Sequence, residues 1–209
     1  MIVKNTSGRY PILYDDVNDI DGFRCRDQFV QLIQSNASKP QYNRAHEWCC
    51  GTGAIGFKIL EQALCKHLVL SDIYQPAVLG CEYTVALNDL SDCVTMYVNS
   101  DIKDLPQHER WDLVVANPPW RSEFRPGPAI SQSLMRKMFD INWHAHQCFY
   151  SSIGGFLDRQ ADVWIYEDQR FSSPDTWQSW FRHAGLVLHE VHGNFGGHDT
   201  GYVMHLKSK

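Results

Sequence analysis

The sequence of 209 residues lacks the features that mark membrane proteins, secreted proteins and structural zinc sites. No stretch approaches the roughly 18 consecutive apolar residues of a membrane span, and residues 1–6 lack the apolar segment of a signal peptide. The seven cysteines show no Cys-x-x-Cys spacing, which argues against a disulfide framework and against structural zinc. We therefore expect a cytoplasmic protein with reduced thiols and no membrane partner.

Ten histidines are present, but their spacing does not predict a metal site. The pairs closest to ligand spacing are His144-x-His146 and His46-x-x-Cys49, and neither has a second pair nearby. We expect no bound metal.

An excess of positive charge is also absent, because 19 Lys and Arg residues stand against 24 Asp and Glu residues. The net charge of -5 gives no global basic field for nucleic-acid binding, although a local basic patch is compatible with it. The hydrophobic content of 44% and the aromatic content of 12% are sufficient for one sizeable globular core. These numbers leave the oligomeric state open.

Strand and helix signals alternate from about residue 45 onward, which is typical of an α/β fold with a mainly parallel sheet. Apolar runs predict strands at residues 45–49, 67–72, 94–98, 111–116, 161–166, 186–191 and 201–206. Helices are predicted at residues 55–65, 76–87, within 131–156 and at 173–183. No helix separates the last two strands, so they are expected to form an antiparallel pair at one edge. The prediction is a Rossmann-like, mostly parallel seven-stranded sheet with an antiparallel edge strand.

Residues 1–44 do not follow this alternation. An extended segment is expected at residues 10–14, and a helix at residues 26–35, where Phe29 and Ile33 belong to an apolar face. We assign residues 1–44 to an N-terminal cap over the carboxyl edge of the sheet. A helical extension that only fills the core is the alternative.

The turn Cys49-Cys50-Gly51-Thr52-Gly53 leaves the first strand of the sheet and enters a helix. Its two glycines allow a tight turn and the close approach of a ligand. Glu47, at the end of the strand, can accept hydrogen bonds from an ammonium group, whereas it would repel a pyrophosphate. No Gly-Lys-Ser/Thr sequence follows, which excludes a Walker-type phosphate loop.

Acidic residues follow the next two strands. Asp72 lies 21 residues after Gly51, close to the spacing at which an acidic side chain receives ribose hydroxyls in dinucleotide-binding folds. Asp101 follows the third strand and can accept a hydrogen bond from an adenine amino group. Ile73 and Ile102 are apolar candidates to sandwich the adenine ring. Taken singly, each aspartate is equally consistent with a helix cap or a solvated turn.

The tetrapeptide Asn117-Pro118-Pro119-Trp120 follows the apolar strand at residues 111–116. Each proline fixes its own φ and removes a backbone donor, and the second biases the first toward an extended form. Such a stiff corner can hold an –NH2 group through the Asn117 side-chain oxygen and the Pro118 carbonyl. Trp120 would cover a flat substrate face. A strand-ending turn with a partly buried tryptophan is the alternative.

The glycine turn, Asp72, Asp101 and Asn117 each follow a successive strand, at the edge where open α/β proteins bind ligands. With these motifs, residues 45–206 resemble the class I S-adenosylmethionine-dependent methyltransferases. The chain is most similar to the N-methyltransferases that carry Asn/Asp-Pro-Pro-aromatic, including release-factor glutamine methyltransferases and adenine-N6 methyltransferases.

The resemblance implies a catalytic domain at residues 45–209 and S-adenosylmethionine as cofactor. It implies that Glu47 and residues 49–53 hold the methionine part of the cofactor, Asp72 its ribose, and Asp101 with Ile102 its adenine. Asn117 would lie between cofactor and acceptor.

Methyl transfer to nitrogen is the expected chemistry, with Asn117, Pro118 and Trp120 as catalytic residues. Pro119, Arg121 and Arg125 would complete the acceptor site, the two arginines by clasping a carboxylate or phosphate; a solvated loop is the alternative. Phe195 is a weaker candidate for substrate contact.

The acceptor expected first is an amide or amine nitrogen of a protein or small molecule, because the chain has no basic excess. A DNA or RNA amino group, adenine-N6 or guanine-N2, is the alternative. An inactive cofactor-binding scaffold subunit is an alternative of another class.

Overall fold

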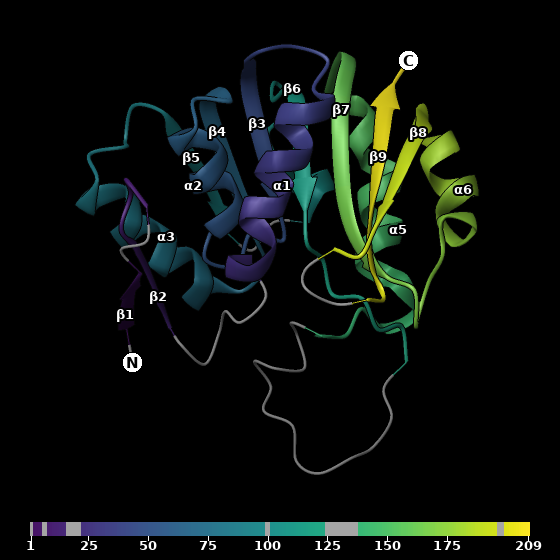
Figure 1. The fold of residues 1–209 in the computed structure, drawn as a ribbon, viewed down its shortest axis with the longest axis horizontal. Coiled ribbons are helices and arrows are strands. Elements are labelled where there is room, and N and C mark those ends of the chain that lie inside the picture. The colour runs from purple at the N-terminus through teal and green to yellow at the C-terminus, as the bar shows by residue number, and fades with distance from the viewer. Residues whose placement is uncertain (1, 6–7, 16–21, 99–100, 124–137, 196–198) are drawn as a thin grey trace.

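The fold is known from a computed structural model, which describes residues 2–5, 8–15, 22–98, 101–123, 138–195 and 199–209. A seven-stranded sheet with the order β5-β4-β3-β6-β7-β9-β8 forms its centre (Figure 1). The strands are β3 (Tyr42–Trp48), β4 (Cys65–Asp72), β5 (Val94–Val98), β6 (Trp111–Ala116), β7 (Leu157–Asp168), β8 (Leu186–Gly193) and β9 (Gly201–Ser208). The predicted fold class is therefore confirmed.

All strand pairs from β5 to β7 are parallel, whereas β9 runs antiparallel to both of its neighbours. The predicted antiparallel pair thus lies at the edge, with the reversed strand β9 inserted between β7 and the outermost strand β8. The bounds of β5 and β6 coincide with the predicted ones.

Helices cover both faces of the sheet and make three layers (Figure 1). They are α1 (Gly22–Asn36), α2 (Ala54–Glu61), α3 (Gln75–Leu87), α5 (His144–Ser152) and α6 (Pro174–His183), with short 3-10 turns η1 (Ile102–Asp104), η2 (Ile141–Trp143) and η3 (Ile153–Gly155). Each face of the sheet has its own hydrophobic core, and successive residues of a strand point to opposite faces. Leu113 and Val115 of β6 pack with α1 and α2 on one face, while Val114 packs with α5 and α6 on the other. Residues 131–137 of the predicted helix range lie outside the described residues.

The N-terminal segment contains helix α1 and a hairpin that precedes it. Helix α1 runs along one face of the sheet beside α2, and Phe29 and Ile33 are completely buried there (Figure 1). The preceding hairpin, β1 (Ile2–Asn5) and β2 (Ile12–Asp15), lies against α3, where the Leu13 amide donates to the Thr84 hydroxyl at 2.9 Å. Strand β3 begins at Tyr42, within the range assigned to this segment. Its role as a cap stays a prediction.

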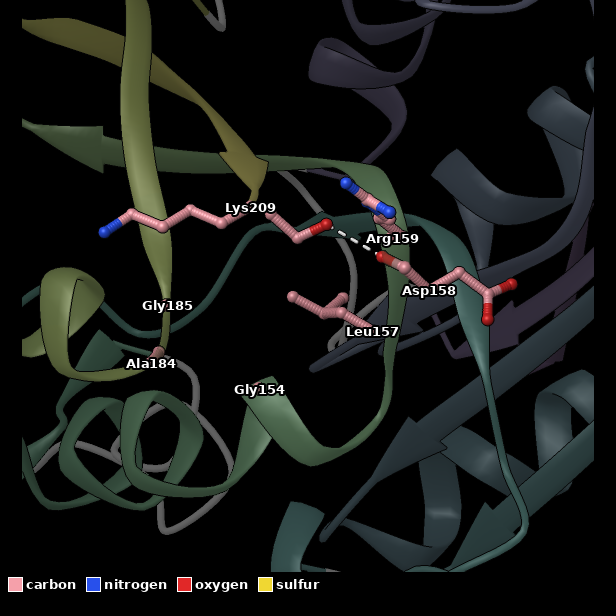
Figure 2. Close-up of a pocket in the computed structure, with 8 residues that line it drawn as sticks. Gly154, Leu157, Asp158, Arg159, Ala184, Gly185 and Lys209 are labelled. Carbon is pink, nitrogen blue, oxygen red and sulfur yellow. Dashed lines mark hydrogen bonds between the residues drawn. The ribbon is translucent and has the colours of Figure 1, made fainter.

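A cavity of about 420 Å³ lies at the amino edge of the sheet, where β7 begins and β9 ends (Figure 2). Its lining includes Leu157, Arg159, Gly185 and Lys209. The Ser208 hydroxyl donates to the Asp158 carbonyl at 2.7 Å and closes one side of it. Since ligands of open α/β proteins bind at the carboxyl edge, this cavity is on the opposite side of the sheet from the expected site.

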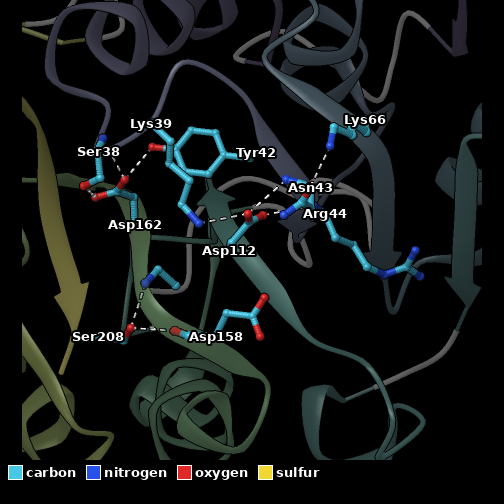
Figure 3. A network of polar contacts seen from close by, with 11 residues as sticks. Ser38, Lys39, Tyr42, Asn43, Arg44, Lys66, Asp112, Asp158, Asp162 and Ser208 are labelled. Atoms are coloured by element: carbon cyan, nitrogen blue, oxygen red, sulfur yellow. Dashed lines mark hydrogen bonds and ion pairs between the residues drawn. The ribbon is translucent and has the colours of Figure 1, made fainter.

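Two buried aspartates organise the same amino edge (Figure 3). Asp112 accepts hydrogen bonds from the Asn43 and Arg44 amides, both at 2.9 Å, and thereby ties β6 to β3. Asp162 on β7 accepts from the Ser38 hydroxyl at 3.0 Å and from the Tyr42 hydroxyl. These contacts hold the strands in register and face away from the carboxyl edge.

No helix in the described ranges is long and apolar enough to span a bilayer.

Candidate methyl-transfer site

The register of the three central strands brings the predicted site residues to one edge. Trp48, near the end of β3, pairs with Ser71 of β4 on one side and with Ala116 of β6 on the other. The residues that follow these three are Cys49, Asp72 and Asn117. The glycine turn and the Asn-Pro-Pro-Trp corner therefore emerge from adjacent strand ends.

The glycine turn has three residues in the left-handed region: Cys49 at φ 54°, Gly51 at 52° and Gly53 at 71°. A side chain at Gly53 is excluded, because its Cβ would lie 2.8 Å from the Phe57 ring. At Gly51, by contrast, a Cβ would meet no atom of the described residues within 4 Å. The Gly51 face of the turn is thus open, while Cys50, Thr52 and Gly53 are buried. Burial, together with the Asp72, Asp140 and Glu47 carboxylates, raises the pKa of the Cys49 thiol.

Asp72 connects the turn to β4. One carboxylate oxygen accepts the Gly51 amide and the other accepts the Tyr74 amide, both at 2.8 Å. The side chain is half-buried. The neighbouring Ile73 is 59% exposed, which makes it an apolar surface available beside the carboxylate.

Glu47 is oriented toward the helix that follows the turn. It is 2% exposed, and its Oε2 accepts the Gly56 amide at 2.7 Å in the first turn of α2. A Cβ at Gly56 would lie 2.6 Å from the same oxygen. Glu47 therefore stabilises the helix N-terminus, a role that the sequence reasoning missed; its contact with the cofactor stays a prediction.

Asp101 and Ile102 lie at the start of η1 with different exposure. Asp101 is half-buried, with one oxygen 3.4 Å from Lys103 Nζ. Ile102 is 1% exposed and packs in the core with Leu105 and Val114. Of the two isoleucines expected to sandwich a ring, only Ile73 presents a surface in the structure.

Asn117 is half-buried, and Pro118 is buried behind it. The Asn117 amide nitrogen lies 3.8 Å from the Cys25 sulfur of α1, so the first turns of α1 support the corner. Among the described residues, no hydrogen bond occupies the Asn117 side-chain oxygen. The acceptor that the prediction requires is therefore available.

Trp120 lies among aromatic and cationic side chains. Its ring lies 5.2 Å from that of Phe171, and the guanidinium carbons of Arg121 and Arg170 lie 4.8 and 5.5 Å from it. Arg170 is held in place by the buried Asp168, whose Oδ1 accepts its Nε at 3.0 Å. Sequence reasoning missed Phe171 and Arg170, because nothing local indicates that a segment fifty residues away reaches Trp120.

Arg121 has no carboxylate partner within the described ranges. Its guanidinium also lies over the Phe139 and Phe171 rings, at 5.6 and 5.2 Å, and its Nε is buried without a hydrogen-bond partner. A half-buried guanidinium in an aromatic surrounding attracts an anion. Arg125, predicted to act beside it, lies outside the described residues.

The profile of the methyltransferase small domain family matches residues 26–141, more than half of the chain. The chain belongs to the methyltransferase small domain family. S-adenosylmethionine is the cofactor of this methyltransferase, as the sequence predicted. A curated relative, ribosomal RNA small subunit methyltransferase C of Salmonella arizonae, is 26% identical over 107 residues, which are 51% of this chain and 30% of that protein.

Solved methyltransferases share the fold of this chain. TYW2 of P. horikoshii, solved in complex with MeSAdo, is 10% identical with a TM-score of 0.66, over 99% of this chain and 70% of that one. The ribosomal protein L11 methylase of Lactobacillus delbrueckii subsp. bulgaricus is 12% identical with a TM-score of 0.62, over 88% and 78%. At such identities the likeness establishes the fold alone.

The edge of this methyltransferase fits its cofactor. The open face at Gly51 admits a ligand against the backbone, and the half-buried Asp72 and Asp101 offer acceptors at the two following strand ends. The exposed Ile73 supplies an apolar surface directly after Asp72 in the chain.

The weaker candidate for substrate contact lies in the core. Phe195 is 3% exposed and packs against Phe29 with ring centroids 4.9 Å apart, so it is a core residue rather than a substrate contact. Within the described part of the chain, no group of three His, Cys, Asp or Glu side chains is arranged to hold a metal ion.

Proposed function

We propose that this methyltransferase transfers the methyl group to a planar amino or amide nitrogen bound at Asn117 and Pro118. The pairing of Trp48 with Ala116 carries the proposal, because it sets the glycine turn and the Asn-Pro-Pro-Trp corner at adjacent strand ends. The side-chain oxygen of Asn117, which accepts no hydrogen bond from the described residues, supports it further.

On this proposal, the Gly51 face, Asp72, Asp101 and Ile73 hold S-adenosylmethionine, which supplies an electrophilic methyl group. The Asn117 oxygen and the Pro118 carbonyl accept the N–H groups of the acceptor and orient its nitrogen lone pair. The same two oxygens stabilise the positive charge that develops on nitrogen. Trp120, fixed by Phe171, Arg121 and Arg170, covers the acceptor plane.

For the acceptor we place an RNA base first, which reverses the order expected from the sequence alone. Two observations support this choice. Arg121, which has no carboxylate partner among the described residues, lies beside Trp120, where a phosphate of the acceptor chain would neutralise it. The relative from Salmonella arizonae is named as a ribosomal RNA methyltransferase. A protein amide remains the second candidate, because Asn-Pro-Pro-Trp resembles the motif of glutamine methyltransferases.

Methyl-labelled S-adenosylmethionine and cell lysate test the proposal. The purified protein is incubated with lysate that has been treated with ribonuclease, protease or neither, and the labelled product is hydrolysed and analysed by mass spectrometry. We expect label that is lost with ribonuclease and is recovered as an N-methylated base. Label that is lost only with protease would move the acceptor to protein. A methyl group on carbon or oxygen would refute the proposed role of Asn117.

A further inference from the structure

A buried histidine outside the motifs joins two carboxylates close to the site. His146 of α5 is completely buried, with Nδ1 2.6 Å from Asp140 Oδ2 and Nε2 2.8 Å from Glu167 Oε1. Asp140 is 4% exposed and Glu167 is completely buried. Both ring nitrogens therefore face an acceptor at short hydrogen-bond distance.

Two acceptors on one imidazole determine where the protons are. A neutral imidazole donates from one nitrogen only, and an ionised carboxylate donates none. Both contacts are satisfied when His146 is an imidazolium between two carboxylates. The stacking of the ring on the face of Trp177, with centroids 4.5 Å apart, favours that charge. The rings of Trp48 and Trp143 lie nearly perpendicular to it, with centroids at 5.6 and 5.4 Å.

Asp140 belongs to the segments that surround Trp120, and Glu167 directly precedes one of them. We name these segments the acceptor wall: residues 120–122, 138–142 and 168–171. Asp140 donates its amide to the Arg121 carbonyl at 2.9 Å, and Asn142 donates to the Ser122 carbonyl at 3.0 Å. Arg121 in turn donates to the Met138 carbonyl at 3.1 Å. These bonds join the chain after the Asn-Pro-Pro-Trp corner to the chain before α5.

The other side of the acceptor wall depends on Glu167. This residue directly precedes Asp168, which holds Arg170 over Trp120. Phe171 lies three residues after Asp168 in the same turn and packs against the Trp120 ring. The Ser172 hydroxyl donates to Glu167 Oε2 at 3.3 Å and fixes the end of this turn. The Asp140–His146–Glu167 triad thus connects the two halves of the wall.

We propose that His146 is a positioning residue: as a double hydrogen-bond donor to Asp140 and Glu167, it holds the two halves of the acceptor wall together around Trp120. The functional consequence rests on the proposed function, since it assumes that the acceptor stacks at Trp120. The claim that His146 holds the two halves of the wall together does not rest on the proposed function, because the wall is defined by its own hydrogen bonds.

The charge of His146 makes the wall sensitive to alkaline pH. Burial lowers the pKa of the ring, but the Glu167 and Asp140 carboxylates outweigh burial and raise the pKa to about 9. The other titratable groups near the triad are the phenols of Tyr150 and Tyr202 and the thiols of Cys49 and Cys148, all neutral below that pH because burial raises each pKa. Loss of the His146 proton therefore removes one of the two donors and loosens the wall.

Amide hydrogen exchange tests the proposal without any knowledge of the acceptor. The glutamine side chain in His146→Gln can donate to at most one of the two carboxylates. In this variant we expect the protection factors of the Arg121, Asp140 and Asn142 amides to fall at least about tenfold, because one charged hydrogen bond contributes on that scale. The matched control is His205→Gln. His205 is also completely buried, is 2.8 Å from Asp162 and stacks on Trp164 at 3.7 Å, but it lies at the amino edge.

His205→Gln is expected to leave those three protection factors unchanged. Equal loss in both variants, or no loss in His146→Gln, would overturn the proposal. Calorimetric affinity for S-adenosylmethionine should stay near that of the wild type in both variants, which separates a failed wall from a failed cofactor site.

A second measurement needs no variant at His146. In the wild type, protection of the wall amides should disappear with the same midpoint as the titration of the His146 ring nitrogens, followed by NMR. Glu167→Gln removes a carboxylate that raises the pKa, so both midpoints should move together to lower pH. The Asn43 and Arg44 amides, bound to Asp112 at the other edge, serve as the internal reference. A wall midpoint that does not follow the histidine would overturn the proposal.

Discussion

Gly51→Ala tests whether the glycine turn faces the cofactor, because the substitution adds one methyl group and keeps the amide that bonds Asp72. At φ 52° an alanine is strained, at a cost of about 1–2 kcal/mol. No overlap adds to this cost, since the new Cβ meets no described atom within 4 Å. For a chain of this size, each kcal/mol lowers the melting temperature by about 2–4 °C.

Gly185→Ala is the matched control for this strain. Gly185 has φ 77° and equally open surroundings, but it lines the cavity at the amino edge (Figure 2). Without cofactor, the two variants should therefore lose similar stability. A saturating ligand at about 100 times its Kd stabilises the wild type by about 2.7 kcal/mol.

The two variants should differ when S-adenosylmethionine is added. In Gly51→Ala the new methyl group occupies the space open to the ligand, so we expect the Kd to rise at least about tenfold, or about 1.4 kcal/mol. Gly185→Ala should retain the wild-type Kd and the full ligand-induced rise in melting temperature. Calorimetry and thermal unfolding measure both quantities. A wild-type Kd in Gly51→Ala would refute the assignment of this face to the cofactor.

Three further predictions follow from the same structure. Arg121→Ala should raise the KM for an RNA acceptor and reduce the slope of log affinity against log salt by about 1, whereas Arg121→Lys should keep most of that slope; equal KM values for wild type and Arg121→Ala would contradict the role of Arg121. Asp162→Ala leaves Tyr42, Ser38 and His205 without their shared acceptor, so the free energy of unfolding should fall by about 3 kcal/mol or more in urea denaturation, with no change in cofactor affinity. Because the folded-state pKa of His146, about 9, lies above its ordinary 6.5, its contribution to stability is complete below pH 6.5 and is lost as the pH rises to about 9. Urea denaturation across this range should show a decline that His146→Gln lacks, and a parallel decline in that variant would assign it to another group.

The strands of the sheet were predictable because each one is indicated by residues within or directly beside it. The strand ends of β5 and β6 coincide with apolar runs bounded by turn residues. Helix α6 begins at Pro174, directly after its N-cap Ser173, which forms a capping box with Thr176. The clustering of Asp72 and Asn117 at one edge was also predictable, because parallel strands end together.

What the sequence did not predict depends on contacts between distant segments. The apolar face of α1 indicates burial but not its partner, and Phe29 meets Phe195 far along the chain. In the same way, Trp120 meets Arg170 and Phe171 only through the turn after β7. Nothing near His146 in the sequence indicates its two partners, Asp140 and Glu167, because they come from other segments. Similarity to release-factor glutamine methyltransferases in particular stays a prediction.

Asn117→Ala tests the central claim, that the corner beside the glycine turn is where methyl transfer occurs. With labelled S-adenosylmethionine and the lysate fraction that accepts label, the account predicts that transfer falls at least about 100-fold, as expected for loss of a preorganised polar group. Calorimetric affinity for S-adenosylmethionine should remain measurable in the same preparation. A near-wild-type rate of transfer in Asn117→Ala would contradict the account.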